Sequence, residues 1–213
     1  MVEGIEGVES DGRRRRAARS RQRIVQAATA RFVAHGYAGT TIGEIARDAG
    51  VATQTVYYDF GAKRNVLHAV LDAAIAGDDP TIPVRAQAWV DELVGQTDPV
   101  AAVGRLVAGS VAILARVAPV YDVLCRAAGE PDVGELFTAN RAARRGDQRA
   151  LVTSLAEAGH LRPGLDVESA ADAVYALVNE EVYLLLVGDC GWDVDRFERW
   201  LADTLRHQLL PPP

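Results

Sequence analysis

The fold of this chain is decided by the stretch Thr41-Ile-Gly-Glu-Ile-Ala-Arg-Asp-Ala-Gly-Val-Ala-Thr-Gln-Thr-Val-Tyr-Tyr-Asp-Phe60. Two helices that cross closely around a tight turn need a small residue at the crossing and a glycine able to adopt positive φ in the turn. They also need an apolar residue on the inner face of the second helix. Ala46, Gly50 and Val56 meet these needs in that order. The stretch therefore predicts a helix-turn-helix.

The inner and outer faces of this motif follow from the same register. The remaining apolar residues are expected to be buried: Ile42, Ile45, Val51 and Phe60. Thr41 is expected to cap the first helix, and Thr53 the second, through their side-chain oxygens. The outer face of the second helix then holds five polar or aromatic residues: Thr53, Gln54, Thr55, Tyr57 and Tyr58.

Those five side chains are of the kinds that contact DNA. Glutamine and threonine can read base edges in the major groove, and tyrosine hydroxyls suit phosphate oxygens. A helical hairpin that packs on another protein, with these residues merely solvated, is the alternative. The Ala, Gly, Val spacing and the local charge favour DNA.

Charge is divided unevenly along the chain. The whole sequence is acidic, with 23 basic and 29 acidic side chains and a net charge of −6. Residues 12–65, however, hold eleven basic and three acidic side chains, whereas residues 66–213 hold twelve basic and twenty-two acidic ones. This asymmetry indicates a head that binds a polyanion and a body that phosphate repels.

A run of arginines precedes the motif, with seven in the twelve residues 12–23. Residues 1–19 are interpreted as a flexible basic arm that reaches phosphates or an adjacent minor groove through Arg13, Arg14, Arg15 and Arg16. A solvated tail without fixed contacts explains the same residues equally well. The acidic residues ahead of the run could also fold back on it: Glu3, Glu6, Glu9 and Asp11.

This N-terminal region resembles the tetracycline-repressor (TetR) family of regulators. The resemblance is carried by five segments: Arg23–Tyr37, Thr40–Ile42, Ile45-Ala46, Ala49–Val51 and Thr55–Lys63. It implies a three-helix head that binds an operator in double-stranded DNA as a dimer. It also implies a body that binds a small molecule and thereby changes the spacing of the two heads.

The resemblance also implies roles for single residues. Thr41 and Lys63 would hold phosphates, residues 53–55 with Tyr57 would enter the major groove, and Tyr58 would pack against the DNA backbone.

Two positions depart from the family pattern. Ala62 cannot cap the fourth helix, where the family often has serine, and such a loss costs about 0.5–2 kcal/mol. Asp59 either accepts from a cytosine amino group or only repels phosphate, and the sequence leaves both open.

The rest of the chain predicts an all-α fold, because apolar residues recur at three- and four-residue spacing and no long stretch alternates with period two. A helix-turn-helix DNA-binding domain is expected over residues 20–77, and a helical-bundle ligand-binding and dimerisation domain over 78–213. Gly and Pro punctuation separates ten expected helices: 20–35, 42–49, 53–60, 63–76, 83–95, 99–116, 119–128, 133–158, 166–187 and 193–209.

The last two long helices are expected to form the dimer interface as a four-helix bundle with a second copy. The apolar residues assigned to it are Val174, Leu177, Val178, Val182, Leu185, Trp200, Leu201 and Leu205. Closing the core of a single subunit is the alternative role for these residues. The resemblance favours the dimer, because two heads one helical turn apart need a rigid spacer.

An effector pocket needs apolar walls with a few polar groups. The candidates in the body are Trp89, Arg105, Tyr121, Cys125, Phe137, Asn140, Tyr175 and Asn179. Each of them also suits ordinary core or surface positions. The abundance of Ala, Val and Leu in residues 99–128 predicts an apolar or aromatic effector, although core packing explains the same composition.

Other classes of function find little support. No catalytic motif, cofactor-binding loop or metal-ligand spacing of the four histidines is found. Cys125 and Cys190 lack CxxC spacing and are expected to be inert thiols rather than redox sensors. The apolar runs are too short to predict a membrane span, and residues 1–10 do not resemble a secretory signal, so a cytoplasmic protein is expected.

The sequence thus predicts a ligand-responsive homodimeric repressor released from a palindromic operator. The rivals are an activator or architectural DNA-binding protein without an effector, and a ligand carrier or enzyme with a vestigial helix-turn-helix.

Overall fold

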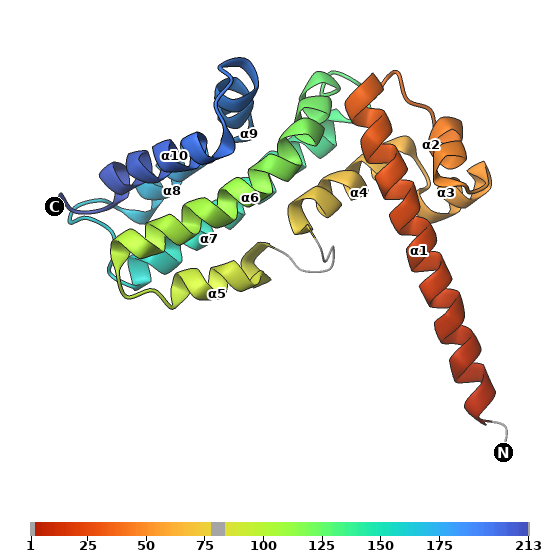
Figure 1. The fold of residues 1–213 in the computed structure, drawn as a ribbon, viewed down its shortest axis with the longest axis horizontal. Coiled ribbons are helices and arrows are strands. Elements are labelled where there is room, and N and C mark those ends of the chain that lie inside the picture. Colours follow the sequence, from red (N-terminus) through yellow and green to blue (C-terminus); the bar gives the residue numbers. More distant parts are fainter. Residues whose placement is uncertain (1–2, 78–83, 213) are drawn as a thin grey trace.

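The computed structural model describes residues 3–77 and 84–212, with the backbone alone given for residues 3–14 and Arg85. Every element in these ranges is helical (Figure 1), which confirms the all-α prediction. The elements are α1 (Glu3–His35), α2 (Ile42–Ala49), α3 (Thr53–Phe60), α4 (Lys63–Ala76), η1 (Val84–Ala86), α5 (Ala88–Val94), α6 (Pro99–Arg126), α7 (Gly134–Glu157), α8 (Val167–Leu177), α9 (Glu180–Tyr183), η2 (Leu184–Asp189) and α10 (Val194–Leu209).

The helices of the head agree with the sequence prediction except at the N-terminus. The bounds of α2, α3 and α4 are the predicted ones, residue for residue. By contrast, α1 begins at Glu3 and not near residue 20, so the segment interpreted as a flexible arm continues the helix as a long projection (Figure 1). Arginine and alanine favour helix, and no proline interrupts residues 12–23. The domain boundary expected between residues 77 and 78 lies at the edge of the described range 3–77.

One long helix, α6, replaces the two helices predicted over 99–116 and 119–128. Pro119 was expected to end the first of them, because a proline inside a helix costs about 3 kcal/mol. Its ring lies at the exposed surface, while its neighbours Ala118 and Val120 are buried. Packing on both sides of Pro119 therefore keeps the helix continuous.

The segment predicted as one helix over 166–187 is broken in the structure. α8 ends at Leu177, and Asn179 adopts an extended conformation in which its side-chain oxygen accepts from the Glu181 N–H at 2.7 Å. Gln148 Nε2 donates to the Val178 carbonyl oxygen at 2.7 Å. The break is thus stabilised by a cap on one side and by a side chain from α7 on the other. A π-helical turn, η2, follows α9.

Two apolar cores share α6. The core of the head is built from α1 to α4 and includes residues of the second half of α6, such as Val117, Tyr121 and Leu124. The core of the body includes residues of its first half, such as Leu106 and Val107, packed with residues of α5, α7, α8 and α10. Figure 1 shows α6 running from the side of α5 to that of α1.

α6 is long and apolar enough to cross a membrane by length and composition. Half of its most apolar stretch is buried inside the protein. The central helix of a folded domain has the same properties, so the composition of α6 is accounted for by its place between the two cores.

Candidate DNA-binding interface

The turn of the helix-turn-helix has the geometry that its sequence predicts. Thr41 caps α2 within a capping box: its Oγ1 accepts from the Glu44 N–H at 3.3 Å, and its own N–H donates to Glu44 Oε2 at 2.9 Å. Gly50 ends α2 in the left-handed region, with φ of 64° and ψ of 41°. Ala46 and Val56 are buried at the crossing. These contacts fix the orientation of α3 against α2.

The outer face of α3 is open to solvent, as expected. Thr53 and Gln54 are exposed, and Thr55 is half-buried. Tyr57 is 48% exposed and Tyr58 is 89% exposed. The inner face is buried at Val56 and Phe60.

The capping role predicted for Thr53 is wrong. The residue before α3 is Ala52, which makes no side-chain cap, and Thr53 is the first residue inside the helix. Val51, expected in the core, is only half-buried beside it. α4 likewise begins after Ala62 without a side-chain cap, as predicted. Two neighbouring helices of the head therefore start with backbone N–H groups that no side-chain cap satisfies, an arrangement that suits phosphate oxygens.

Two arginines of α1 bond to the helix-turn-helix, Arg31 to α2 and Arg21 to α3. Arg31 Nη1 lies 3.2 Å from Glu44 Oε1, and Arg31 Nε donates to Asp48 Oδ2 at 2.5 Å. The hydrogen bond from Arg31 lowers the pKa of Asp48, and the bonds from Thr41 lower that of Glu44. Arg31 thus neutralises the two carboxylates of α2, so these acids oppose an approaching phosphate less strongly.

Arg21 joins α1 to the end of α3. Its Nη1 donates to the Asp59 carbonyl oxygen at 3.2 Å, and its guanidinium lies 4.2 Å from the centre of the Phe60 ring. The sequence prediction did not single out Arg21 or Arg31, because an arginine that supports another helix and one that contacts DNA look alike in sequence.

Lys63, expected to hold a phosphate, already has partners within the head. Its Nζ donates to the carbonyl oxygens of Tyr37 at 2.9 Å and Thr40 at 3.1 Å, and lies 4.1 Å from the centre of the Tyr37 ring. Arg64, next to it, is exposed. The Lys63-Arg64 pair thus supplies one cation that secures the turn after α1 and one at the surface.

The arginines expected to form a DNA-contacting arm lie on α1. Arg15 and Arg16 are exposed there. The side chains of Arg13 and Arg14 lie outside the described residues, so their contact with DNA stays a prediction.

Several effector candidates gather where α6, α7 and α8 meet. The ring centres of Tyr121 and Phe137 are 6.4 Å apart. The Arg144 guanidinium lies 5.4 Å from the centre of the Tyr121 ring and 4.8 Å from that of Tyr175. Arg144 was not predicted, and it forms an ion pair with the buried Glu180. These residues form one cluster of aromatic and charged side chains, the kinds of group that contact a ligand with both rings and polar groups.

Other effector candidates border this aromatic cluster or lie elsewhere. Cys125 is half-buried, and burial raises the pKa of its thiol, as expected for an inert cysteine. Asn140 is half-buried on α7, and Asn179 serves as the cap of α9. Trp89 lies against Gly109, where a Cβ would come within 2.3 Å of its indole, and Arg105 forms an ion pair with Glu92. Trp89 thus packs against α6, and Arg105 forms a partly exposed ion pair.

The predicted dimer residues divide into two groups. Val174, Val178, Leu201 and Leu205 are buried in the core of the single chain, which corrects their assignment to an interface: they fill the subunit itself. The other four keep surface open to solvent: Leu177, Val182, Leu185 and Trp200. Leu185 is 54% exposed.

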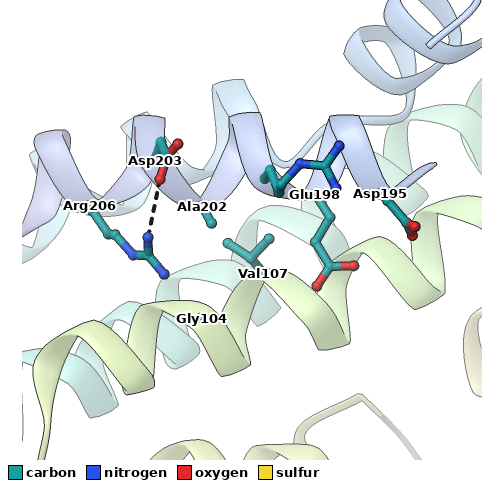
Figure 2. Close-up of a pocket in the computed structure, with 8 residues that line it drawn as sticks. Gly104, Val107, Asp195, Glu198, Ala202, Asp203 and Arg206 are labelled. Carbon is teal, nitrogen blue, oxygen red and sulfur yellow. Dashed lines mark hydrogen bonds and ion pairs between the residues drawn. The ribbon is translucent and has the colours of Figure 1, made fainter. Parts of the chain in front are cut away.

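A groove of about 520 Å³ lies between α6 and α10 (Figure 2). Gly104 and Val107 of α6 form one side, and charged residues of α10 form the other, among them Glu198 and an Asp203–Arg206 ion pair with an N–O distance of 3.1 Å. None of the predicted effector residues lines it, and its charged wall does not suit an apolar effector. Within the described part of the chain, no three His, Cys, Asp or Glu side chains gather to hold a metal ion.

The fold and the exposed α3 define a helix-turn-helix head on a helical body, the architecture of a class of DNA-binding regulators. A model of the family described as bacterial regulatory proteins, tetR family, matches residues 24–70. The probable HTH-type transcriptional regulator ArpR of Pseudomonas putida is 30% identical over 204 residues, which span 92% of this chain and 94% of that protein. The chain belongs to the TetR family of bacterial transcriptional regulators, as the resemblance predicted.

Solved structures show the same fold. NalD, the secondary repressor of the MexAB-OprM multidrug efflux pump in Pseudomonas aeruginosa, matches with a TM-score of 0.70 and 20% identity, covering 92% of this chain and 100% of that one. A SmeT–triclosan complex matches with a TM-score of 0.70 and 21% identity, covering 90% of this chain and 92% of that one.

Proposed function

We propose that this protein is a homodimeric, ligand-responsive transcriptional repressor of the cytoplasm, that it binds a palindromic operator and that it is not an enzyme. The observation that carries the proposal is the outer face of α3, with Tyr58 89% exposed, on a head whose α2 carboxylates are neutralised by Arg31. A surface that presents exposed aromatic and amide groups beside uncapped helix starts suits a phosphate-lined groove.

Each side chain of this surface has a proposed role. Thr53, Gln54, Thr55 and Tyr57 enter the major groove, where Gln54 contacts a base edge, and Tyr58 packs against the DNA backbone. The N-terminal end of α2 at Thr41 and that of α4 near Lys63 approach phosphates. Because the carbonyls of Tyr37 and Thr40 already hold Lys63, exposed Arg64 adds charge at the same place. The arginines Arg13, Arg14, Arg15 and Arg16 add contacts from α1 that do not depend on DNA sequence.

The proposed effector is aromatic and binds at the cluster of Tyr121, Phe137 and Tyr175. SmeT, which shares the fold, is known in complex with triclosan, a precedent for a small molecule bound by this architecture. Binding there would favour a head spacing that no longer fits two successive major grooves. NalD, of the same fold, is a repressor, which supports this sign of regulation.

The proposed dimer uses the exposed apolar residues of the C-terminal region. Leu177, Val182, Leu185 and Trp200 retain exposed surface near one another in sequence, and a second copy would bury it. The four residues buried in the subunit support this face from below without touching the partner.

Selection from a pool of random duplexes tests the proposal. The purified protein is mixed with the pool, the bound fraction is amplified, and the selection is repeated at rising salt. We expect a palindrome to be enriched, and its affinity to fall steeply with salt, because each neutralised phosphate adds about 0.9 to the log–log slope. Binding without an enriched sequence would contradict the proposal.

A further inference from the structure

Tyr37 is contacted from two sides by different parts of the molecule. It lies in the turn between α1 and α2, where its ring is buried and stacks on Phe32 at 5.8 Å. The Lys63 ammonium lies over the same ring and binds the Tyr37 carbonyl oxygen. The first residue of α4, which follows the recognition helix α3 by three positions, is therefore attached to Tyr37.

The Tyr37 hydroxyl forms a hydrogen bond with a residue outside the head. It donates to Asp132 Oδ2 at 2.6 Å, across 95 positions of sequence. Asp132 lies in the connection between α6 and α7, and the next residue, Val133, is fully buried in the core that the head shares with α6. A short hydrogen bond to a carboxylate is among the stronger single contacts in a protein.

The other end of α4 is also tied to the body. Arg116 of α6 donates to the carbonyl oxygens of Ala74 at 3.0 Å and Ile75 at 3.3 Å. The apolar packing of the head on the second half of α6 joins the two regions, and directional hydrogen bonds restrain how they are oriented. Arg116 supplies such bonds at the C-terminal end of α4, and the Tyr37–Asp132 bond supplies one near its N-terminal end, beside α3.

We infer that the Tyr37–Asp132 pair is a positioning contact that sets the angle of the head on the body and hence the half-site spacing that the dimer accepts. The inference rests on the proposed function, because spacing has meaning only for two heads on one operator. Neither residue is proposed to contact DNA. Both act through the direction in which α3 is presented.

The test uses the full-length protein and synthetic duplexes that carry the selected palindrome with its half-sites at the selected distance, or one base pair closer or farther. For the wild type we expect strong discrimination against the altered spacings. In Tyr37→Phe the ratio of the affinity for the selected spacing to that for an altered spacing should fall about three- to tenfold, the scale of the net contribution of one intramolecular hydrogen bond. Affinity for the selected spacing should change less.

A second variant and a matched control keep the test decisive. Asp132 is exposed, so Asp132→Ala leaves the cores intact, removes the acceptor and should relax spacing as Tyr37→Phe does, with little further effect in the double variant. Tyr183→Phe removes a phenol hydroxyl from a buried tyrosine of the body and should leave discrimination unchanged. If the wild type discriminates between spacings and both variants discriminate equally well, the inference is wrong and the proposed function stands. A wild type that enriches no paired site would overturn the proposed function and the inference with it.

Discussion

The two halves of α6 belong to one helix and to different cores. Leu106, in the first half, packs among residues of the body, whereas Leu124, in the second half, packs among residues of α1 and α4. Both side chains are fully buried. The head is therefore joined to the body by helix packing as well as by the connection between α4 and α5. A displacement of α6 in one core moves apolar side chains in the other, which is the coupling that a ligand-responsive regulator needs.

Truncating a buried leucine in either half of α6 is expected to have the largest effect on stability. We expect Leu124→Ala and Leu106→Ala each to lower the free energy of unfolding by about 2–5 kcal/mol. All three tryptophans, Trp89, Trp192 and Trp200, lie in the body, so their fluorescence reports on the body alone. Urea unfolding followed by this fluorescence should shift for Leu124→Ala as it does for Leu106→Ala. A tryptophan transition that Leu124→Ala leaves in place would show that the two cores unfold independently.

The next largest effects are expected from alanine at one glycine of the head and one of the body, with opposite signs. Gly50 has a φ of 64°, so Gly50→Ala should cost about 1–2 kcal/mol in the head. Gly104 lies inside α6 with open space around it, and Gly104→Ala should stabilise the body by about 0.5–1 kcal/mol. Thermal unfolding measures both. Equal effects of the same sign would mean that the turn geometry at Gly50 does not limit stability.

Within the head, α2 begins with a side-chain cap and α4 begins without one, so the contribution of a cap to stability can be measured in both directions. Thr41→Ala removes the capping box of α2 and should cost about 1 kcal/mol. Ala62 lies before α4 in an extended conformation, φ −143° and ψ 158°, without a cap, so Ala62→Ser should stabilise by about 0.5–1 kcal/mol. Urea midpoints that move the same way for both variants would argue against the caps assigned here.

The smallest effect is expected from pH. The pKa of Glu44 is lowered in the folded head, first by the Thr41 hydroxyl and then by the Thr41 N–H. Its contribution to stability is therefore present above the pKa of the unfolded chain and is lost as pH falls through the lowered folded value. Between neutral and acidic pH the wild type should lose slightly more stability than Glu44→Gln. Identical dependence of stability on pH in the two proteins would show that the Glu44 carboxylate does not stabilise the head.

Most of the head could be predicted from its sequence, because its determinants are local, although the start of α1 and the cap assigned to Thr53 were wrong. Thr41, Gly50 and Val56 lie within sixteen residues, and each does what its chemistry dictates. The exposed residues of α3 followed from that register. What the sequence could not show was the partner of Lys63, because the carbonyl oxygens that hold it belong to residues more than twenty positions earlier.

The body was predicted less well, because distant contacts decide it. Pro119 and the break at Asn179 were both misjudged, since burial beside the proline and the bond from Gln148 come from the tertiary structure. Apolar periodicity identified the faces of α8 and α10 but did not distinguish a subunit core from a dimer interface. Arg144 was missed because an arginine on an otherwise polar helix is ordinarily a solvated one.

The outer face of α3 is proposed to read DNA sequence, and Gln54 is the side chain of that face best suited to a base edge. Anisotropy titrations would compare the wild type and Gln54→Ala on the selected duplex and on a shuffled duplex of the same composition. We expect Gln54→Ala to lose about 1–3 kcal/mol in binding free energy on the selected duplex and to bind the shuffled one as the wild type does. An equal loss on both duplexes, or no loss on either, would contradict it.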